Sequence, residues 1–362
     1  MIAMSRSDVH LPDETTLLTA IPAMLGFIPE RSVILVALGA ERGVVRATIR
    51  HDLDLDETGA VTAEQIAVLD SLGRIIAGYG VDTVLVVLAD DRYPPADERY
   101  RRVLSVADRC LAPAGGARRG YVVGGDYQSG APWRLIWSGR GHRHRSAGVP
   151  DRVGVLADPH TSPTALAEAV ATGRRLLTRR SQMAAMLEPS AHCAGPCTRD
   201  DEWPGGSAAR PDDSDAELLR LLVEAVTHPD PDRACATVRR LERAITTIPV
   251  RDAALAFAVT DHRHAAEDLW RDLTRRLDGE GRASAATLLA HLHYIGGEGA
   301  YAGVALDCAL TAAPDWTLAG LLDQALRGGM PPVELRSMID KSYVIARRLG
   351  VTIPLVTLRA AG

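Results

Sequence analysis

The feature that most constrains the fold is a change of pattern along the chain. Up to about residue 140, short apolar runs such as 32–38 and 81–89 alternate with stretches of helical spacing. The apolar runs have the length and β-branched content of buried strands, whereas Leu69, Leu72 and Ile76 recur at the spacing of one helix face. After residue 160 only the helical spacing remains. The sequence therefore predicts an α/β part with a mixed sheet, followed by an all-α part.

The α/β part is expected to span residues 1–160. Its expected strands are 32–38, 44–50, 81–89, 120–123 and 133–137, and its expected helices are 16–25, 62–78 and 95–110. The first two strands read as an antiparallel hairpin across the glycine-bounded turn 39–43. Helical crossovers would make the strands at 44–50, 81–89 and 120–123 parallel, and the last strand would add an antiparallel edge.

The rest of the chain divides into three predicted segments. A cap and proline at Ser162-Pro163 open a connecting helix to about residue 180 within 161–187, and 188–213 has the Pro, Gly, Asp and Ser content of a flexible linker. An all-α domain follows over 214–362. Within it, 286–314 has the spacing of one tetratricopeptide-like helical hairpin, although a single copy favours an ordinary helical hairpin over a true repeat.

Composition limits the possible locations and partners. The apolar runs are too short to span a bilayer, the first residues lack a signal-peptide pattern, and five cysteines do not form a disulfide framework, so we expect a soluble cytoplasmic protein without membrane contact. A net charge of -5 and the lack of aromatic residues among basic ones make nucleic acid an unfavoured partner. Lys341 is the only lysine, so the chain is arginine-rich, which suits phosphate or carboxylate ligands or else reflects a GC-rich genome.

Four segments together resemble a known family. They are LLTAIPAMLGFIPERSVILVAL near the N-terminus, AVATGRRLLTRRSQMAAMLEP, VRDAALAFAV, and GGEGAYAGVALDCALTAAPDWTLAGLLDQALRGGMPP. They are similar to an actinobacterial domain-of-unknown-function family, number 4192. The resemblance implies an actinobacterial origin and no known activity, substrate or catalytic residue. Members of that family often carry a cysteine-rich patch after a Trp-containing strand, whereas residues 138–145 here contain no cysteine, so a metal or redox role for that patch does not carry over.

Aspartates follow the ends of the strands that the crossovers would make parallel. Asp52 and Asp54 follow the strand at 44–50, Asp90 follows the strand at 81–89, and Asp126 follows the strand at 120–123. Ligands of open α/β sheets bind outside the carboxyl ends of the strands, and Mg²⁺ prefers oxygen ligands. The four aspartates are therefore candidate ligands of a divalent metal. Alternatively, their side chains accept hydrogen bonds from turn amides.

A second candidate site lies in one basic segment. Arg140, His142, Arg143, His144 and Arg145 bring cationic and hydrogen-bonding groups together within six positions. Such groups suit an anion or phosphate, although the same residues are also typical of a solvated loop.

Two functional hypotheses remain. The chain contains no phosphate-binding Walker loop, no nucleophile elbow and no zinc-protease motif. We therefore expect a binding or scaffold protein that contacts a protein partner through its helical part. The alternative is an enzyme, assisted by Mg²⁺ or Mn²⁺, that acts on a phosphorylated or other anionic small molecule at the carboxyl edge of the sheet. Whether the protein is an enzyme stays open.

Overall fold

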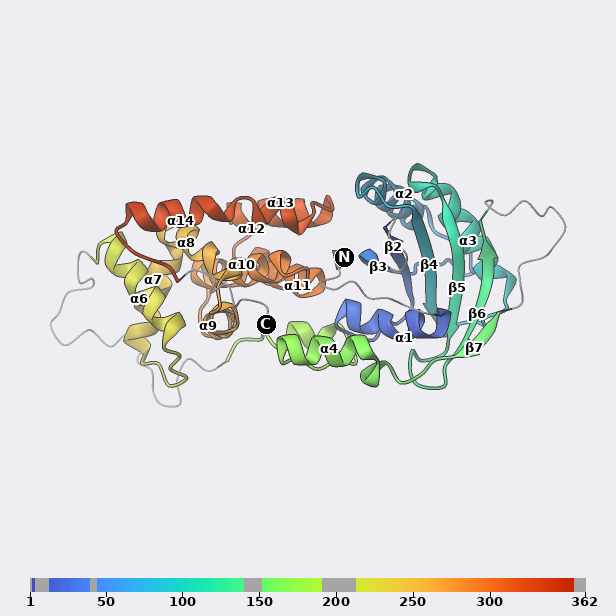
Figure 1. Cartoon of the computed structure of the whole chain (residues 1–362), viewed down its shortest axis with the longest axis horizontal. Coiled ribbons are helices and arrows are strands. Elements are labelled where there is room, and N and C mark those ends of the chain that lie inside the picture. The colour runs from blue at the N-terminus through green and yellow to red at the C-terminus, as the bar shows by residue number, and fades with distance from the viewer. Residues whose placement is uncertain (1, 4–12, 40–43, 140–151, 191–212, 355–362) are drawn as a thin grey trace, which may run out of the picture. The chain divides into compact units, whose positions relative to one another are not determined.

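The computed structural model describes residues 2–3, 13–39, 44–139, 152–190 and 213–354. Its contacts divide into two compact units, and each is described by itself. The first unit consists of Met1–Gln182 with Gly297–Ala300 and Arg327–Pro331, and the second of Met183–Gly296, Tyr301–Leu326 and Pro332–Gly362. A sheet covered by helices makes up the first unit and helices make up the second, which confirms the predicted fold class (Figure 1).

Seven strands of the described residues form one mixed sheet. They are β1 (Ile2–Ala3), β2 (Ser32–Leu38), β3 (Val45–Asp52), β4 (Thr83–Asp90), β5 (Ala117–Gly124), β6 (Pro132–Ser138) and β7 (Val153–Val155), in the order β1-β3-β2-β4-β5-β6-β7. Strands β4 and β5 pair in parallel, while β2 pairs antiparallel with both β3 and β4. Because β2 lies between them, β3 and β4 point the same way. The carboxyl ends of β3, β4 and β5 therefore share one edge, as the crossovers predicted.

Helices cover both faces of this sheet (Figure 1). The first unit contains α1 (Glu14–Leu25), α2 (Ala63–Gly78), α3 (Glu98–Cys110), the short 3-10 turns η1 (Ala112–Ala114) and η2 (Pro159–Thr161), α4 (Pro163–Thr172) and the start of α5 (Ser181–Ala185), which runs across the division between the units. One buried cluster joins alternate side chains of β2, β3 and β4 to the inner faces of α2 and α3. Helix α1 packs on the other face, where Trp133 of β6 donates a hydrogen bond to Thr15. The result is a three-layer arrangement of helix, sheet and helix.

The interior strands are buried on both sides. In β2, Val33 and Leu35 belong to the cluster under α2 and α3, and Ile34 and Val36 are equally buried. Each such side chain contributes about 1.5–3 kcal/mol when fully removed from water. This burial explains why β2 reads as a continuous apolar run instead of an alternating one.

The helix predicted within 161–187 is shorter than expected. Helix α4 ends at Thr172 because Gly173 adopts a left-handed conformation with φ 69° and donates its amide to Ala169. The chain then turns away, and Leu177 forms an isolated bridge with Phe27 at the end of α1. The apolar residues after Gly173 therefore pair with another segment instead of extending the helix.

The second unit is helical throughout its described residues. Its helices are α6 (Asp215–Thr227), α7 (Cys235–Thr246), α8 (Ile248–Ala254), the 3-10 helix η3 (Leu255–Val259), α9 (Arg263–Arg276), α10 (Gly279–Ile295), α11 (Gly299–Ala312), α12 (Thr317–Arg327), α13 (Pro332–Arg336) and α14 (Ile339–Arg348); α11 and α12 each share an end with the first unit. Helix α6 begins with a capping box between Ser214 and Glu217. Helix α10 is buried along nearly its whole length, which is typical of a central helix surrounded by others. Helices α10 and α11 follow one another over the predicted hairpin, and its tetratricopeptide-like character stays a prediction.

Candidate functional site

The carboxyl edge of the sheet holds the four predicted metal ligands. Asp52 and Asp90 are the last residues of β3 and β4, and Asp54 and Asp126 lie two residues beyond β3 and β5. Because these three strands point the same way, the strand ends that carry the four aspartates lie at one edge of the sheet. What each carboxylate does there depends on its own neighbours.

Asp90 is engaged by two side chains. Its carboxylate is buried and accepts hydrogen bonds from Nε of Arg92, at 2.9 Å, and from the hydroxyl of Tyr100, at 3.0 Å. Burial, followed by the neighbouring charge of Asp90, raises the pKa of Tyr100, so the phenol stays protonated and donates. Asp90 therefore joins α3 to the end of β4.

The other predicted ligands have separate surroundings. Asp52 is exposed and forms an ion pair with Arg50, and Asp54 accepts a hydrogen bond from the hydroxyl of Thr62 at 2.8 Å. Asp126 is exposed beside a small pocket. Over the described part of the chain, no three His, Cys, Asp or Glu side chains are grouped so that they could hold one metal ion. A divalent metal at this edge stays a prediction.

The small pocket, here called the carboxyl-edge pocket, is about 260 Å³ and lies between the ends of β4 and β5. Arg31, which lines it, donates two hydrogen bonds to Asp91 at 2.8 and 3.3 Å, and these bonds lower the pKa of Asp91. Arg179, which also lines the pocket, forms an ion pair with Glu30 at 3.3 Å. Both arginines of this pocket are therefore already neutralised by carboxylates of the same pocket.

The predicted basic segment lies outside the described residues. Arg140, His142, Arg143, His144 and Arg145 fall within 140–151. Their role as an anion contact stays a prediction.

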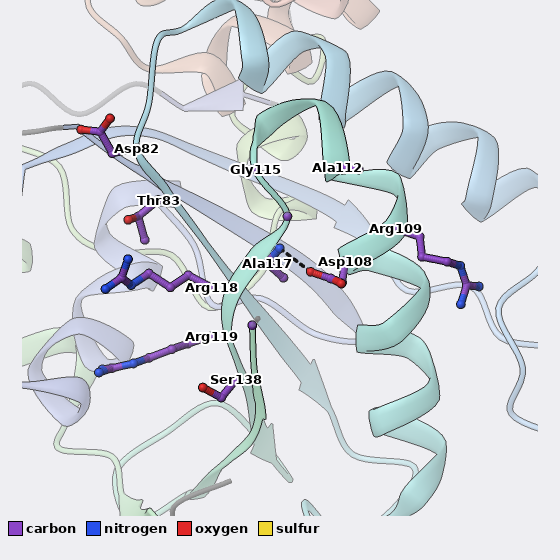
Figure 2. Close-up of a pocket in the computed structure, with 12 residues that line it drawn as sticks. Asp82, Thr83, Asp108, Arg109, Ala112, Gly115, Ala117, Arg118, Arg119 and Ser138 are labelled. Carbon is purple, nitrogen blue, oxygen red and sulfur yellow. Dashed lines mark hydrogen bonds between the residues drawn. The ribbon is translucent and has the colours of Figure 1, made fainter. Parts of the chain in front are cut away.

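A larger pocket, of about 520 Å³, opens at the opposite edge of the sheet (Figure 2). It is built from the first residues of β4 and β5, the last residue of β6, the end of α3 and the turn after it. Its lining residues are Asp82, Thr83, Asp108, Arg109, Ala112, Gly115, Gly116, Ala117, Arg118, Arg119, Ser138 and Gly139. We call it the arginine pocket.

A β-bulge aims two consecutive arginines into this pocket. Val84 of β4 pairs with Ala117 of β5, but the next residue, Leu85, pairs with Arg119, so Arg118 is an extra residue in the strand. Successive side chains of a regular strand point to opposite faces, and a bulge interrupts that alternation. Figure 2 shows the result, with the side chains of Arg118 and Arg119 extending in the same direction from β5.

The two arginines differ in their partners. Arg119 donates to Glu14 at 2.9 Å, a carboxylate that also pairs with Arg152. Its hydrogen bond with the phenol oxygen of Tyr121 is the main cause that raises the pKa of Arg119. Arg118 is exposed, and no hydrogen bond or ion pair engages its side chain in the described ranges. Arg118 is therefore a guanidinium with its donors available to a ligand.

Close contacts between backbone segments position the walls of the arginine pocket. The carboxylate of Asp108, at the end of α3, accepts a hydrogen bond from the amide of Ala117 at 2.9 Å, which ties the helix end to the bulge. Gly139 accommodates the bulge, because a Cβ there would lie 2.4 Å from the carbonyl oxygen of Ala117. The amides of Gly115 and Gly116 already donate to carbonyls of the preceding turn. Side chains therefore supply the donors of this pocket.

Sequence reasoning missed Arg118 and Arg119. It began the strand at residue 120 and placed the site at the carboxyl edge, whereas β5 begins at Ala117. The two adjacent arginines directly before the apolar run are visible in the sequence, but only the pairing of β5 with β4 shows that both line one pocket.

Comparison with known proteins gives one match. The family model described as "Domain of unknown function (DUF4192)" matches residues 15–333. Neither the curated proteins nor the solved structures contain a match to this chain. In the described part of the chain, no helix is both long and apolar enough to cross a membrane.

Proposed function

The chain belongs to the domain-of-unknown-function 4192 family, and from this premise we propose that its first unit is a binding module for an anionic small molecule. The ligand sits in the arginine pocket. The single observation that supports this most is the bulge, which directs Arg118, a guanidinium without a partner in the described chain, to the same side as Arg119.

Comparison of the two edges supports this choice. An anion entering the carboxyl-edge pocket has to compete with Asp91 and Glu30 for Arg31 and Arg179. An anion entering the arginine pocket meets Arg118 directly. Planar guanidinium groups bind phosphate or carboxylate through two parallel hydrogen bonds, and such charge-assisted bonds are about twice as strong as neutral ones.

Binding is supported over catalysis by the groups that line the arginine pocket. Its titratable lining residues are arginines and two aspartates, of which Asp108 is already held by the amide of Ala117. A nucleophile paired with a base, as in covalent catalysis, is not formed by these lining residues. The metal-assisted enzyme predicted at the carboxyl edge is an independent alternative, and it requires Asp90 to bind a metal ion.

The test is calorimetric titration of the full chain with orthophosphate and pyrophosphate at low ionic strength. We expect Arg118→Ala to weaken binding about tenfold or more, because two charge-assisted hydrogen bonds contribute about 1.5–3 kcal/mol. The matched control is Arg102→Ala, which removes the same charge from an exposed position of α3 away from the pocket. Equal affinities in the two variants would mean that the arginine pocket does not bind the anion.

The helical unit carries a second proposal, a contact surface for a protein partner. It is supported by large apolar side chains that remain exposed there, Leu321 on α12 at 58%, Val333 on α13 at 70% and Met338 at 49%. Proximity labelling in the native host should recover a set of neighbours that Val333→Asp loses while an exposed polar change on α9, Asp268→Asn, keeps it. An unchanged set with Val333→Asp would reject this surface.

A further inference from the structure

We infer that the ligand of the arginine pocket is a phosphorylated polyol of sugar-phosphate size, an anion that also donates hydrogen bonds to a carboxylate. This inference rests on the proposed anion-binding function and goes further, because it assigns the chemistry of the part of the ligand that is not charged.

Asp82 carries the inference. It lines the same pocket, directly before β4, and it is exposed. Across the described residues, no hydrogen bond or ion pair engages its carboxylate, since only its backbone amide is bonded, to the carbonyl of Leu38. Figure 2 shows Asp82 and Thr83 on the side of β5 to which Arg118 and Arg119 extend. The pocket therefore offers an available cation and an available anion on one side.

An available carboxylate discriminates among anions. An ionised carboxylate only accepts hydrogen bonds, so it favours a ligand group that donates, such as a hydroxyl. A second anionic group next to Asp82 is repelled, because like charges in a partly enclosed site oppose each other. Dicarboxylates that present an anion at each end therefore suit the pocket less well than an anion with a neutral donating end.

The hydroxyls of the pocket agree with this assignment. Thr83, the first residue of β4, and Ser138, which pairs with Arg119 across β5 and β6, both line the pocket. Neither hydroxyl has a hydrogen-bond partner among the described residues. A hydroxyl both donates and accepts, so these two groups can bind ligand hydroxyls or phosphate oxygens.

Volume sets the size of the ligand. The pocket of about 520 Å³ falls within the usual range of about 300–1,000 Å³ for small-molecule sites. It is larger than a bare phosphate needs, so the phosphate can occupy the arginines while a polyol chain reaches the hydroxyls and Asp82.

The experiment compares four probes by calorimetry on the full chain: ribose 5-phosphate, ribose, orthophosphate and succinate. We expect ribose 5-phosphate to bind about tenfold more tightly than orthophosphate, the factor that one additional charge-assisted hydrogen bond supplies. Asp82→Asn should reduce this preference to less than about threefold while orthophosphate affinity stays the same or rises. Arg118→Ala should weaken both phosphate probes. The control is Asp70→Asn, which removes a carboxylate of α2 outside the pocket and should leave all affinities unchanged.

The outcomes separate the two levels of the proposal. If no anionic probe binds the wild-type chain, the anion-binding function itself is rejected. If orthophosphate and ribose 5-phosphate bind equally and Asp82→Asn changes nothing, anion binding stands and the polyol assignment is rejected. Tighter binding of succinate than of ribose 5-phosphate likewise overturns the polyol assignment. The polyol assignment is supported if Asp82→Asn loses the preference for ribose 5-phosphate over orthophosphate while Asp70→Asn keeps it.

Discussion

Removal of the guanidinium of Arg92 tests whether Asp90 is a structural carboxylate or a metal ligand. The side chain of Asp90 is fully buried and that of Arg92 is 25% exposed. In Arg92→Ala, Asp90 retains the hydrogen bond from Tyr100, and the carbonyl of Leu53 loses its bond from Arg92. Breaking a buried ion pair by removing one partner costs about 3–5 kcal/mol, and the partial exposure of Arg92 places this pair at the lower end. We therefore expect a loss of about 3 kcal/mol.

The neighbouring pair provides the control. Arg31 and Asp91 lie at the same edge of the sheet, and their side chains are 61% and 44% exposed. Exposed pairs contribute about 0–1 kcal/mol, so Arg31→Ala should cost at most that amount. Tyr100→Phe, which removes one hydrogen bond to the buried carboxylate, should cost about 1–3 kcal/mol.

The assay is urea unfolding followed by circular dichroism, with and without Mg²⁺ or Mn²⁺. If Asp90 serves only to join α3 and β4, neither ion restores the stability of Arg92→Ala. Two results would refute this reasoning: a cost below about 1 kcal/mol for Arg92→Ala, or stabilisation of the wild-type chain by the metal that Asp90→Asn abolishes. The second result would support the metal-assisted enzyme predicted from the sequence.

Three further predictions concern packing and buried titratable groups. Gly73→Ala should destabilise the chain by about 1–3 kcal/mol in urea titrations, because its methyl group would lie 2.3 Å from a backbone oxygen of α3. The control Gly78→Ala, in the same helix, meets no atom within 4 Å and should stabilise the chain by about 0.5–1 kcal/mol. Burial lowers the pKa of His291 from 6.5 to about 4, so the fold is most stable above pH 6.5, where this histidine is neutral, and it loses stability as the pH falls toward 4. His291→Leu should reduce the slope of unfolding free energy against pH in this range by up to about 1.4 kcal/mol per pH unit. An unchanged slope would contradict this prediction. Burial raises the pKa of Cys110 to about 11, so iodoacetamide at pH 8 should label half-buried Cys235 faster than Cys110, as followed by mass spectrometry. Equal rates at the two cysteines would argue against a protected Cys110 thiol.

Much of the fold was predictable because local signals and burial agree. The strand at 32–38 was predicted with its observed bounds, since an interior strand buried on both faces is a continuous apolar run. Helix α2 begins directly after Thr62, where the sequence predicted its start, and the side chain of Thr62 accepts a hydrogen bond from the amide of Gln65. The prediction was wrong where a tertiary contact determines the local structure. The helix expected up to residue 180 ends at Thr172, and Leu177 pairs with Phe27 instead.

The candidate site was harder to predict because it depends on register and burial. An aspartate that follows a strand looks the same in sequence whether it binds a metal or, like Asp90, a buried tyrosine and arginine. The bulge at Arg118 arises from the pairing of β5 with β4, and no local pattern of β5 states which residue is left unpaired. Adjacent arginines normally diverge across a strand, so their convergence on one pocket becomes visible only with the sheet register.

The two edges of the sheet differ in whether their arginines are already paired with carboxylates. The rule that ligands bind at the carboxyl ends of strands directs attention to Arg31, whose donors are already used by Asp91. A ligand must first displace that carboxylate, and the displaced Asp91 then repels an incoming anion. Arg118 requires no such exchange, because no carboxylate within the described chain engages its donors. A small anion should therefore bind an unpaired guanidinium more readily than a paired one at the carboxyl edge of the sheet. This favours the arginine pocket as the first site to mutate.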